Sequence, residues 1–157
     1  PMAGPVSFVF TAIEGVGALR EALGADFDAL SEVHCDVIRQ ASPSVRGYVV
    51  ESGSTAFVLA FHAAAKGLSF CLAVQSRLQN ASWPDTLDGV LGVPGATTSE
   101  DGLFRGLRVA MGIHTGLLGF GLDESTGRTA YLGAAVRRGA AVRRGAASRR
   151  RAMGARF

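Results

Sequence analysis

The stretch VSFVFTAIEGVG, residues 6–17, decides the fold expected for this chain. Its first half alternates valine or phenylalanine with smaller residues, the period-two pattern typical of a half-buried β-strand. Two glycines follow in Glu14-Gly15-Val16-Gly17, and glycine permits a tight turn in which backbone N–H groups face a ligand. The stretch therefore predicts a strand, a turn and the start of a helix. Ile13, Glu14 and Gly15 would form either an ordinary turn or a phosphate-binding loop.

The rest of the chain predicts an alternation of helices and strands up to residue 132. Apolar residues recur at helical spacing in 18–41, where Gly24 and Asp26 favour a split into two helices, and again in 62–81. Residues 82–104, rich in glycine, proline, serine and threonine, predict a surface insertion. Strand patterns cover the ranges 47–52, 56–61, 107–121 and 129–132. The order strand, helix, strand, strand, helix, strand predicts an α/β (α+β) fold, a ferredoxin-like sandwich.

Composition places the chain among globular proteins with one domain. It has 157 residues, 48% of them hydrophobic, which suffices for one core. No apolar run approaches the ~18–20 residues of a membrane span. The two cysteines, Cys35 and Cys71, are too few for a disulfide framework. We therefore expect buried thiols and a reducing, cytoplasmic setting.

Charge is distributed unevenly along the chain. The net charge is +3, but residues 134–157 contain eight arginines and no acidic residue, so the remaining residues carry −5. Arginine pairs bidentately with phosphate and carboxylate groups. This segment is therefore predicted to be either a solvated basic extension or a contact to a polyanion, such as RNA, anionic lipid or an acidic protein surface. The contact residues would be Arg137, Arg138, Arg143, Arg144, Arg149, Arg150 and Arg151.

Four stretches, in order, resemble the catalytic domain of class III nucleotide cyclases. FTAIEG (10–15) resembles the family's FTDIEG, and GYVVESGSTAFVLAF (47–61) resembles its GYEVKTEGDSFMVAF hairpin. GLRVAMGIHTG (106–116) is similar to LRVRVGIHTG. DESTGRTAYLG (123–133) is similar to the DEVTKGYDYYG of kinetoplastid receptor-type adenylate cyclases.

This resemblance implies an architecture and a division of the chain. The expected fold is a sandwich of an antiparallel sheet with helices on one face. A cyclase-homology domain would span residues 1–133 and include the insertion at 82–104. An arginine-rich segment would follow at 134–157, and only its first part matches the family's next helix.

The family's six catalytic and substrate-binding positions all carry other residues in this chain. By resemblance, the two metal-binding aspartates correspond to Ala12 and Thr55, or to Ser54 if the turn is shifted by one residue. Divalent metal ions need carboxylate oxygens there. The adenine-selecting lysine, its partner aspartate, the ribose-orienting asparagine and the transition-state arginine correspond to Glu51, Ala130, Arg137 and Ala141. The resemblance therefore implies a degenerate domain, or pseudo-cyclase, that needs no cofactor and acts as a structural or regulatory subunit.

Two alternatives to this interpretation stay open. An active adenylate or guanylate cyclase would need substitute ligands for Mg²⁺ or Mn²⁺, and Glu14 and Glu51 are the candidate carboxylates. A polyanion-binding module would act through the arginine-rich segment, with the domain as its platform. In either case the family implies pairing with a cyclase-like domain, as a homodimer or heterodimer, within a larger assembly. Its kinetoplastid members imply association with the flagellum.

Overall fold

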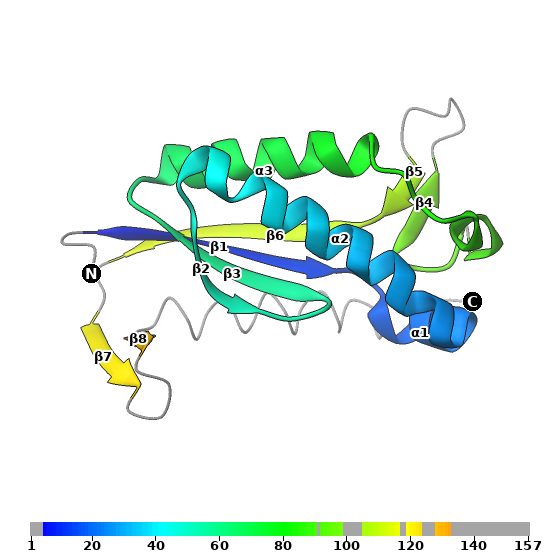
Figure 1. Cartoon of the computed structure of the whole chain (residues 1–157), viewed down its shortest axis with the longest axis horizontal. Coiled ribbons are helices and arrows are strands. Elements are labelled where there is room, and N and C mark those ends of the chain that lie inside the picture. The colour runs from blue at the N-terminus through cyan, green and yellow to red at the C-terminus, as the bar shows by residue number, and fades with distance from the viewer. Residues whose placement is uncertain (1–4, 91, 99–104, 117–118, 124–127, 133–157) are drawn as a thin grey trace, which may run out of the picture.

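The computed structural model describes residues 5–90, 92–98, 105–116, 119–123 and 128–132. Its centre is a four-stranded antiparallel sheet in the order β2–β3–β1–β6 (Figure 1). The strands are β1 (Val6–Ile13), β2 (Tyr48–Ser52), β3 (Ala56–Phe61) and β6 (Val109–Gly116). This sheet, with the helices described next, confirms the predicted ferredoxin-like α+β sandwich.

Two long helices cover one face of the sheet. α2 (Phe27–Ala41) and α3 (Ala64–Gln79) share one buried core with β1 and β3. A shorter helix, α1 (Val16–Leu23), follows β1 directly. The predicted split before α2 is confirmed at Gly24, whose positive φ of 56° suits glycine. Asp26 occupies the N-cap position of α2, but its side chain makes no capping hydrogen bond.

The remaining elements are short. β4 pairs with β5 and β7 pairs with β8, each as a separate two-stranded sheet. The single strand predicted over 107–121 is wrong, because that range contains the end of β5, all of β6 and the start of β7. The short elements are η1 (Gly24–Asp26), η2 (Pro43–Val45), η3 (Asp85–Val90), β4 (Ala96–Thr98), β5 (Arg105–Leu107), β7 (Gly119–Asp123) and β8 (Arg128–Leu132).

The first strand, β1, is buried on both faces. Val9 and Ile13 point into the main core beneath the helices. The prediction of a half-buried strand is wrong because the alternate residues are buried as well, on the opposite face of the sheet. Those residues form a second, smaller cluster of Val6, Phe8, Phe10, Val58 and Ala60.

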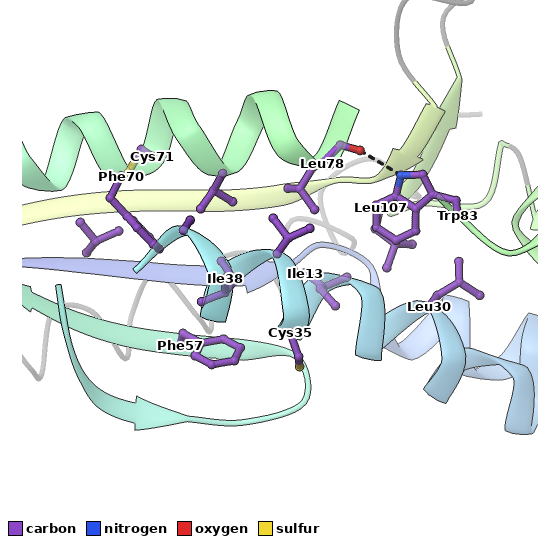
Figure 2. Close-up of a cluster of buried hydrophobic side chains, with 14 of the residues drawn as sticks. Ile13, Leu30, Cys35, Ile38, Phe57, Phe70, Cys71, Leu78, Trp83 and Leu107 are labelled. Atoms are coloured by element: carbon purple, nitrogen blue, oxygen red, sulfur yellow. Dashed lines mark hydrogen bonds between the residues drawn. The ribbon is translucent and has the colours of Figure 1, made fainter. Parts of the chain in front are cut away.

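The segment predicted as a surface insertion contributes to the main core. The Trp83 side chain is buried, and its indole Nε1–H donates a hydrogen bond to the Leu78 carbonyl at 3.0 Å (Figure 2). The ring lies on Gly106, where a Cβ atom would come within 2.7 Å of Nε1. Leu87, Val90 and Ala96 are buried in the same core. The polar, glycine-rich composition of residues 82–104 did not indicate that these four widely spaced apolar residues would be buried.

Some predictions concern residues outside the described ranges. The domain boundary at residue 133, the arginine-rich segment 134–157 and the positions Arg137 and Ala141 belong to this group and stay predictions. In the part of the chain that is described, no helix has the length and apolarity required to traverse a bilayer.

Candidate functional site

The turn between β1 and α1 is held by backbone hydrogen bonds within the chain. The amide of Ile13 donates to the Thr55 carbonyl at 2.9 Å, and the amide of Glu14 donates to the Arg108 carbonyl at 2.8 Å. Gly15, with a φ of 64°, is the N-cap of α1 and accepts the first bonds of that helix through its carbonyl. A phosphate bound here would have to replace partners that the amides of Ile13 and Glu14 already have.

A second segment packs directly on this turn. A Cβ atom added to Gly15 would clash with the Pro94 carbonyl, and one added to Gly95 would clash with the carbonyl of Glu14. The amide of Arg108 donates to the Gly95 carbonyl at 2.7 Å. The backbone of Arg108 therefore links Gly95 to Glu14, because its amide donates to Gly95 and its carbonyl accepts from Glu14. These contacts explain why the strand predicted over 107–121 is interrupted at Arg108.

The turn also carries an ion pair. Arg108 Nε lies 3.3 Å from Glu14 Oε2, and the Glu14 side chain is 31% exposed. Surface pairs of this kind add little stability, typically about 0–1 kcal/mol. The position of this pair matters more than its stability, because the Glu14 carboxylate already has a cationic partner, Arg108, from its own chain.

Helix α2 braces the turn between β2 and β3. The Cys35 thiol donates to the Ser54 carbonyl at 3.4 Å, and burial raises the pKa of this thiol. His34 is fully buried, and its ring meets Phe57 edge-on with 5.8 Å between the centroids. Burial lowers the pKa of His34 to about 4. The backbone of Ser54 raises this pKa, but by less than burial lowers it. Neither ring nitrogen has a hydrogen-bond partner of ordinary geometry among the described residues.

Comparison with known proteins identifies the family. No protein-family model matches the chain. Over 142 residues the chain is 34% identical to the adenylate cyclase of Lachancea kluyveri, a match that covers 88% of this chain and 8% of the relative. Over 148 residues it is 32% identical to receptor-type adenylate cyclase B of Leishmania donovani, covering 82% of this chain and 11% of the relative. The chain belongs to the class III nucleotide cyclase family. It spans about a tenth of the length of these curated relatives.

Solved structures of cyclase domains share the fold. An adenylate cyclase of Trypanosoma brucei in its monomeric state superposes with a TM-score of 0.77 at 23% identity, covering 91% of this chain and 68% of that one. The monomeric guanylyl cyclase domain of the RhoGC fusion protein from Blastocladiella emersonii gives a TM-score of 0.61 at 12% identity, covering 87% and 72%. At these identities the likeness establishes the fold alone.

In this cyclase-homology domain, the two positions predicted to correspond to metal-binding aspartates lie next to each other. Ala12 is paired across the sheet with Ala56, the residue after Thr55, and the bond from the Ile13 amide to Thr55 fixes the turn. Neither Ala12 nor Thr55 carries a charge. Within the described ranges, no group of three or more His, Cys, Asp or Glu side chains is placed to hold a metal ion.

The other predicted site residues are spread over several elements. Glu51 lies on β2 opposite Val58, so it shares the sheet face of the smaller cluster and of Ala12. Ala130 lies on β8, paired with Gly121. The hypothesis that Glu14 and Glu51 together hold a metal stays a prediction, and it requires Glu14 to exchange its Arg108 partner.

Three residues of this site were not found by sequence reasoning. His34 stands four residues after Leu30 and four before Ile38, so the helical apolar period already indicated that it would be buried. Cys35 was expected to be a buried thiol, but its contact with the turn depends on the tertiary fold. Arg108 carried no local signal, since its partners come from distant segments.

Proposed function

We propose that this chain is a degenerate nucleotide cyclase homology domain that makes no cyclic nucleotide and serves as a structural or regulatory subunit. The observation that carries the proposal is the adjacency of Ala12 and Thr55. The strand register brings the backbone of Thr55 beside that of Ala12 and Ile13, and neither Ala12 nor Thr55 is a carboxylate. Loss of one pre-organised electrostatic group typically costs about 10²–10³ in rate. Loss of the two residues that would hold the divalent ions leaves no ordinary way to bind them.

The surroundings of these positions support the same proposal. The Glu14 carboxylate is paired with Arg108, and two amides of the turn donate to carbonyls of the same chain. A triphosphate-binding site favours backbone amides without internal partners, because each internal hydrogen bond must break before a phosphate oxygen can replace it. Two of the three amides named as phosphate donors, those of Ile13 and Glu14, are instead already bonded within the chain.

A direct assay tests the loss of activity. The full chain is incubated with ATP or GTP and either Mg²⁺ or Mn²⁺, with an active homologue as the positive control, and cyclic nucleotide is quantified. We expect none above background. Turnover that disappears in Glu14→Ala or Glu51→Ala would contradict the proposal and support the alternative, an active cyclase with these two carboxylates as metal ligands.

Pairing with another cyclase-like domain is the regulatory part of the proposal. The solved neighbours include a monomeric adenylate cyclase and a dimeric guanylyl cyclase domain, so both states occur on this fold. Sedimentation tests the pairing. The chain is measured alone, with a catalytic homologue, and with larger assemblies from the source cell. Localisation of the tagged chain tests the expected cytoplasmic and flagellar setting.

Polyanion binding is a second candidate, favoured by the eight arginines in residues 134–157 and the absence of acidic residues there. Engagement of about half of them with duplex nucleic acid predicts a log–log salt slope near −4, at about −0.9 per neutralised phosphate. The full chain is compared with a chain truncated after Gly133 for binding to RNA, anionic vesicles and an acidic protein. Unchanged affinity and salt slope after truncation would contradict this function.

A further inference from the structure

Two polar side chains in the main core have buried atoms with no hydrogen-bond partner among the described residues. They are Thr11, on β1, and His34, on α2, and neither has any exposed surface. The atoms concerned are Thr11 Oγ1 and both ring nitrogens of His34. Buried polar atoms are almost always hydrogen-bonded to protein or to ordered water, because an unpaired atom loses its hydration without compensation. Both side chains therefore need a partner.

Phe57 brings these two side chains to the same part of the core. Thr11 is the cross-strand partner of Phe57, so their side chains are neighbours on one face of the sheet. That face is the one under the helices, because Val9 and Ile13, two residues to either side of Thr11, belong to the main core. The His34 ring meets the Phe57 ring edge-on, with 5.8 Å between the centroids. Thr11 and His34 therefore approach each other between β1 and α2.

The imidazole of His34 also faces the turn between β2 and β3. The backbone of Ser54 raises the pKa of His34, as a carbonyl does when it faces an imidazole N–H. The thiol of Cys35 donates to the same Ser54 carbonyl at 3.4 Å. A neutral imidazole has one N–H donor and one acceptor nitrogen. With its donor directed at Ser54, the ring keeps its acceptor nitrogen for the side of Thr11.

We propose that one buried water molecule links Thr11 to His34, accepting from the Thr11 hydroxyl and donating to the acceptor nitrogen of the imidazole. The other ring nitrogen donates to the Ser54 carbonyl. A bridging water fits because the two side chains share Phe57 as a neighbour but do not meet at hydrogen-bond distance. Internal waters occupy such positions, where they satisfy polar groups that have no other partner.

This chain of hydrogen bonds makes His34 a positioning residue for the candidate site. On β1, Thr11 directly precedes Ala12. At the turn, Ser54 directly precedes Thr55. One side chain of α2 thus fixes the two segments relative to each other, next to both positions that resemble the metal-binding aspartates of the family. The link concerns the backbone of these segments, so it holds whether or not the chain makes cyclic nucleotide.

A double-mutant cycle in the full chain tests the link. Thr11→Val and His34→Phe, singly and together, are compared with wild type by urea unfolding at about pH 8, where the imidazole is neutral in both states. We expect the combined effect on the unfolding equilibrium constant to fall short of the product of the single effects by about 10-fold. The matched control is Ser31→Ala, since Ser31 is also buried on α2 but donates to the Asp28 carbonyl at 3.0 Å. The effects of Thr11→Val and Ser31→Ala should multiply to within about twofold.

Nuclear magnetic resonance of the folded chain separates a hydrogen-bonded link from packing alone. We expect magnetisation transfer from a long-lived bound water to the carbon-bound ring protons of His34. We also expect a nitrogen chemical shift that marks one ring nitrogen as a hydrogen-bond acceptor. Thr11→Val should abolish both signals, whereas Thr11→Ser, which keeps the hydroxyl, should retain them. Circular dichroism verifies that each variant is folded.

Three results would overturn the proposal. The first is a pair of substitutions, Thr11→Val and His34→Phe, whose effects simply multiply. The second is a wild-type His34 ring that receives no magnetisation from water. The third is a water signal that persists unchanged in Thr11→Val, because that water would then be held by other groups. None of these measurements involves catalysis, so they leave the proposed loss of cyclase activity to its own assay.

Discussion

The buried histidine of α2 makes the stability of this domain depend on pH in a way that can be calculated. His34 has no exposed surface, and burial lowers its pKa from 6.5 to about 4 in the folded state. In the unfolded chain the imidazole titrates near its ordinary value of about 6.5. Between that pH and about pH 4, the imidazole of His34 is protonated in the unfolded state but stays neutral in the folded state. The free energy of unfolding must therefore fall as pH falls from about 6.5 to about 4.

The size of the effect follows from the two pKa values. A shift from 6.5 to about 4 corresponds to a total of about 3 kcal/mol, at about 1.4 kcal/mol per pKa unit. Between pH 7 and pH 5, where most of the lost stability already appears, we expect a loss of about 2 kcal/mol. That is a large share of the roughly 5–15 kcal/mol by which a domain is stable.

Equilibrium unfolding in urea at several pH values between 7 and 4.5 measures this loss, with wild type compared to His34→Phe and His34→Leu. The packing cost of either substitution does not depend on pH, and the other ionisable groups are common to all three proteins. The difference between wild type and variant thus isolates the histidine. The free energy of unfolding of the variant, relative to that of wild type, should rise by about 2 kcal/mol as the pH falls from 7 to 5. A difference that stays constant with pH would refute the assigned burial of a neutral imidazole.

The same structure makes three further predictions about substituted chains. Gly15→Ala should destabilise the domain by at least about 1–2 kcal/mol for its positive φ alone, whereas Gly89→Ala, with open space around it, should leave the melting temperature unchanged. Trp83→Phe removes the indole donor from a buried carbonyl and should cost about 1–3 kcal/mol in urea unfolding. Ala12→Asp combined with Thr55→Asp should lower the melting temperature in EDTA and regain it in Mn²⁺; equal stability in both buffers would mean that these positions are not adjacent.

Much of the fold was predictable because its signals are local. The strands at 47–52 and 56–61 and the helices on either side of Gly24 follow from short-range periodicity and glycine geometry. Helical spacing likewise indicated which face of α2 is buried. The resemblance in four ordered stretches added the topology that local patterns leave open. The adjacency of Ala12 and Thr55 was expected on those grounds, and the strand register agrees with it.

Contacts between distant segments were not predictable in the same way. The segment after α3 appears polar in composition, yet Trp83 lies under Gly106 and reaches a carbonyl of α3. The interruption at Arg108 arises from bonds to Gly95 and Glu14, neither of which is near it in sequence. A period-two pattern also cannot tell one covered face from two, which is why β1 was expected to be half-buried.

Under the proposed function, the internal bonds of the β1–α1 turn and the neutral residues Ala12 and Thr55 are parts of one change. A pair of metal-binding aspartates places two like charges close together, and the bound ions offset their repulsion. If Ala12 and Thr55 correspond to those aspartates, as proposed, no such repulsion exists and the turn would need no ion to offset it. The bonds from the amides of Ile13 and Glu14 to the carbonyls of Thr55 and Arg108 hold the β1–α1 turn within the chain. A domain of the proposed kind would keep the fold of this turn whether or not nucleotide is bound, as a constant scaffold requires.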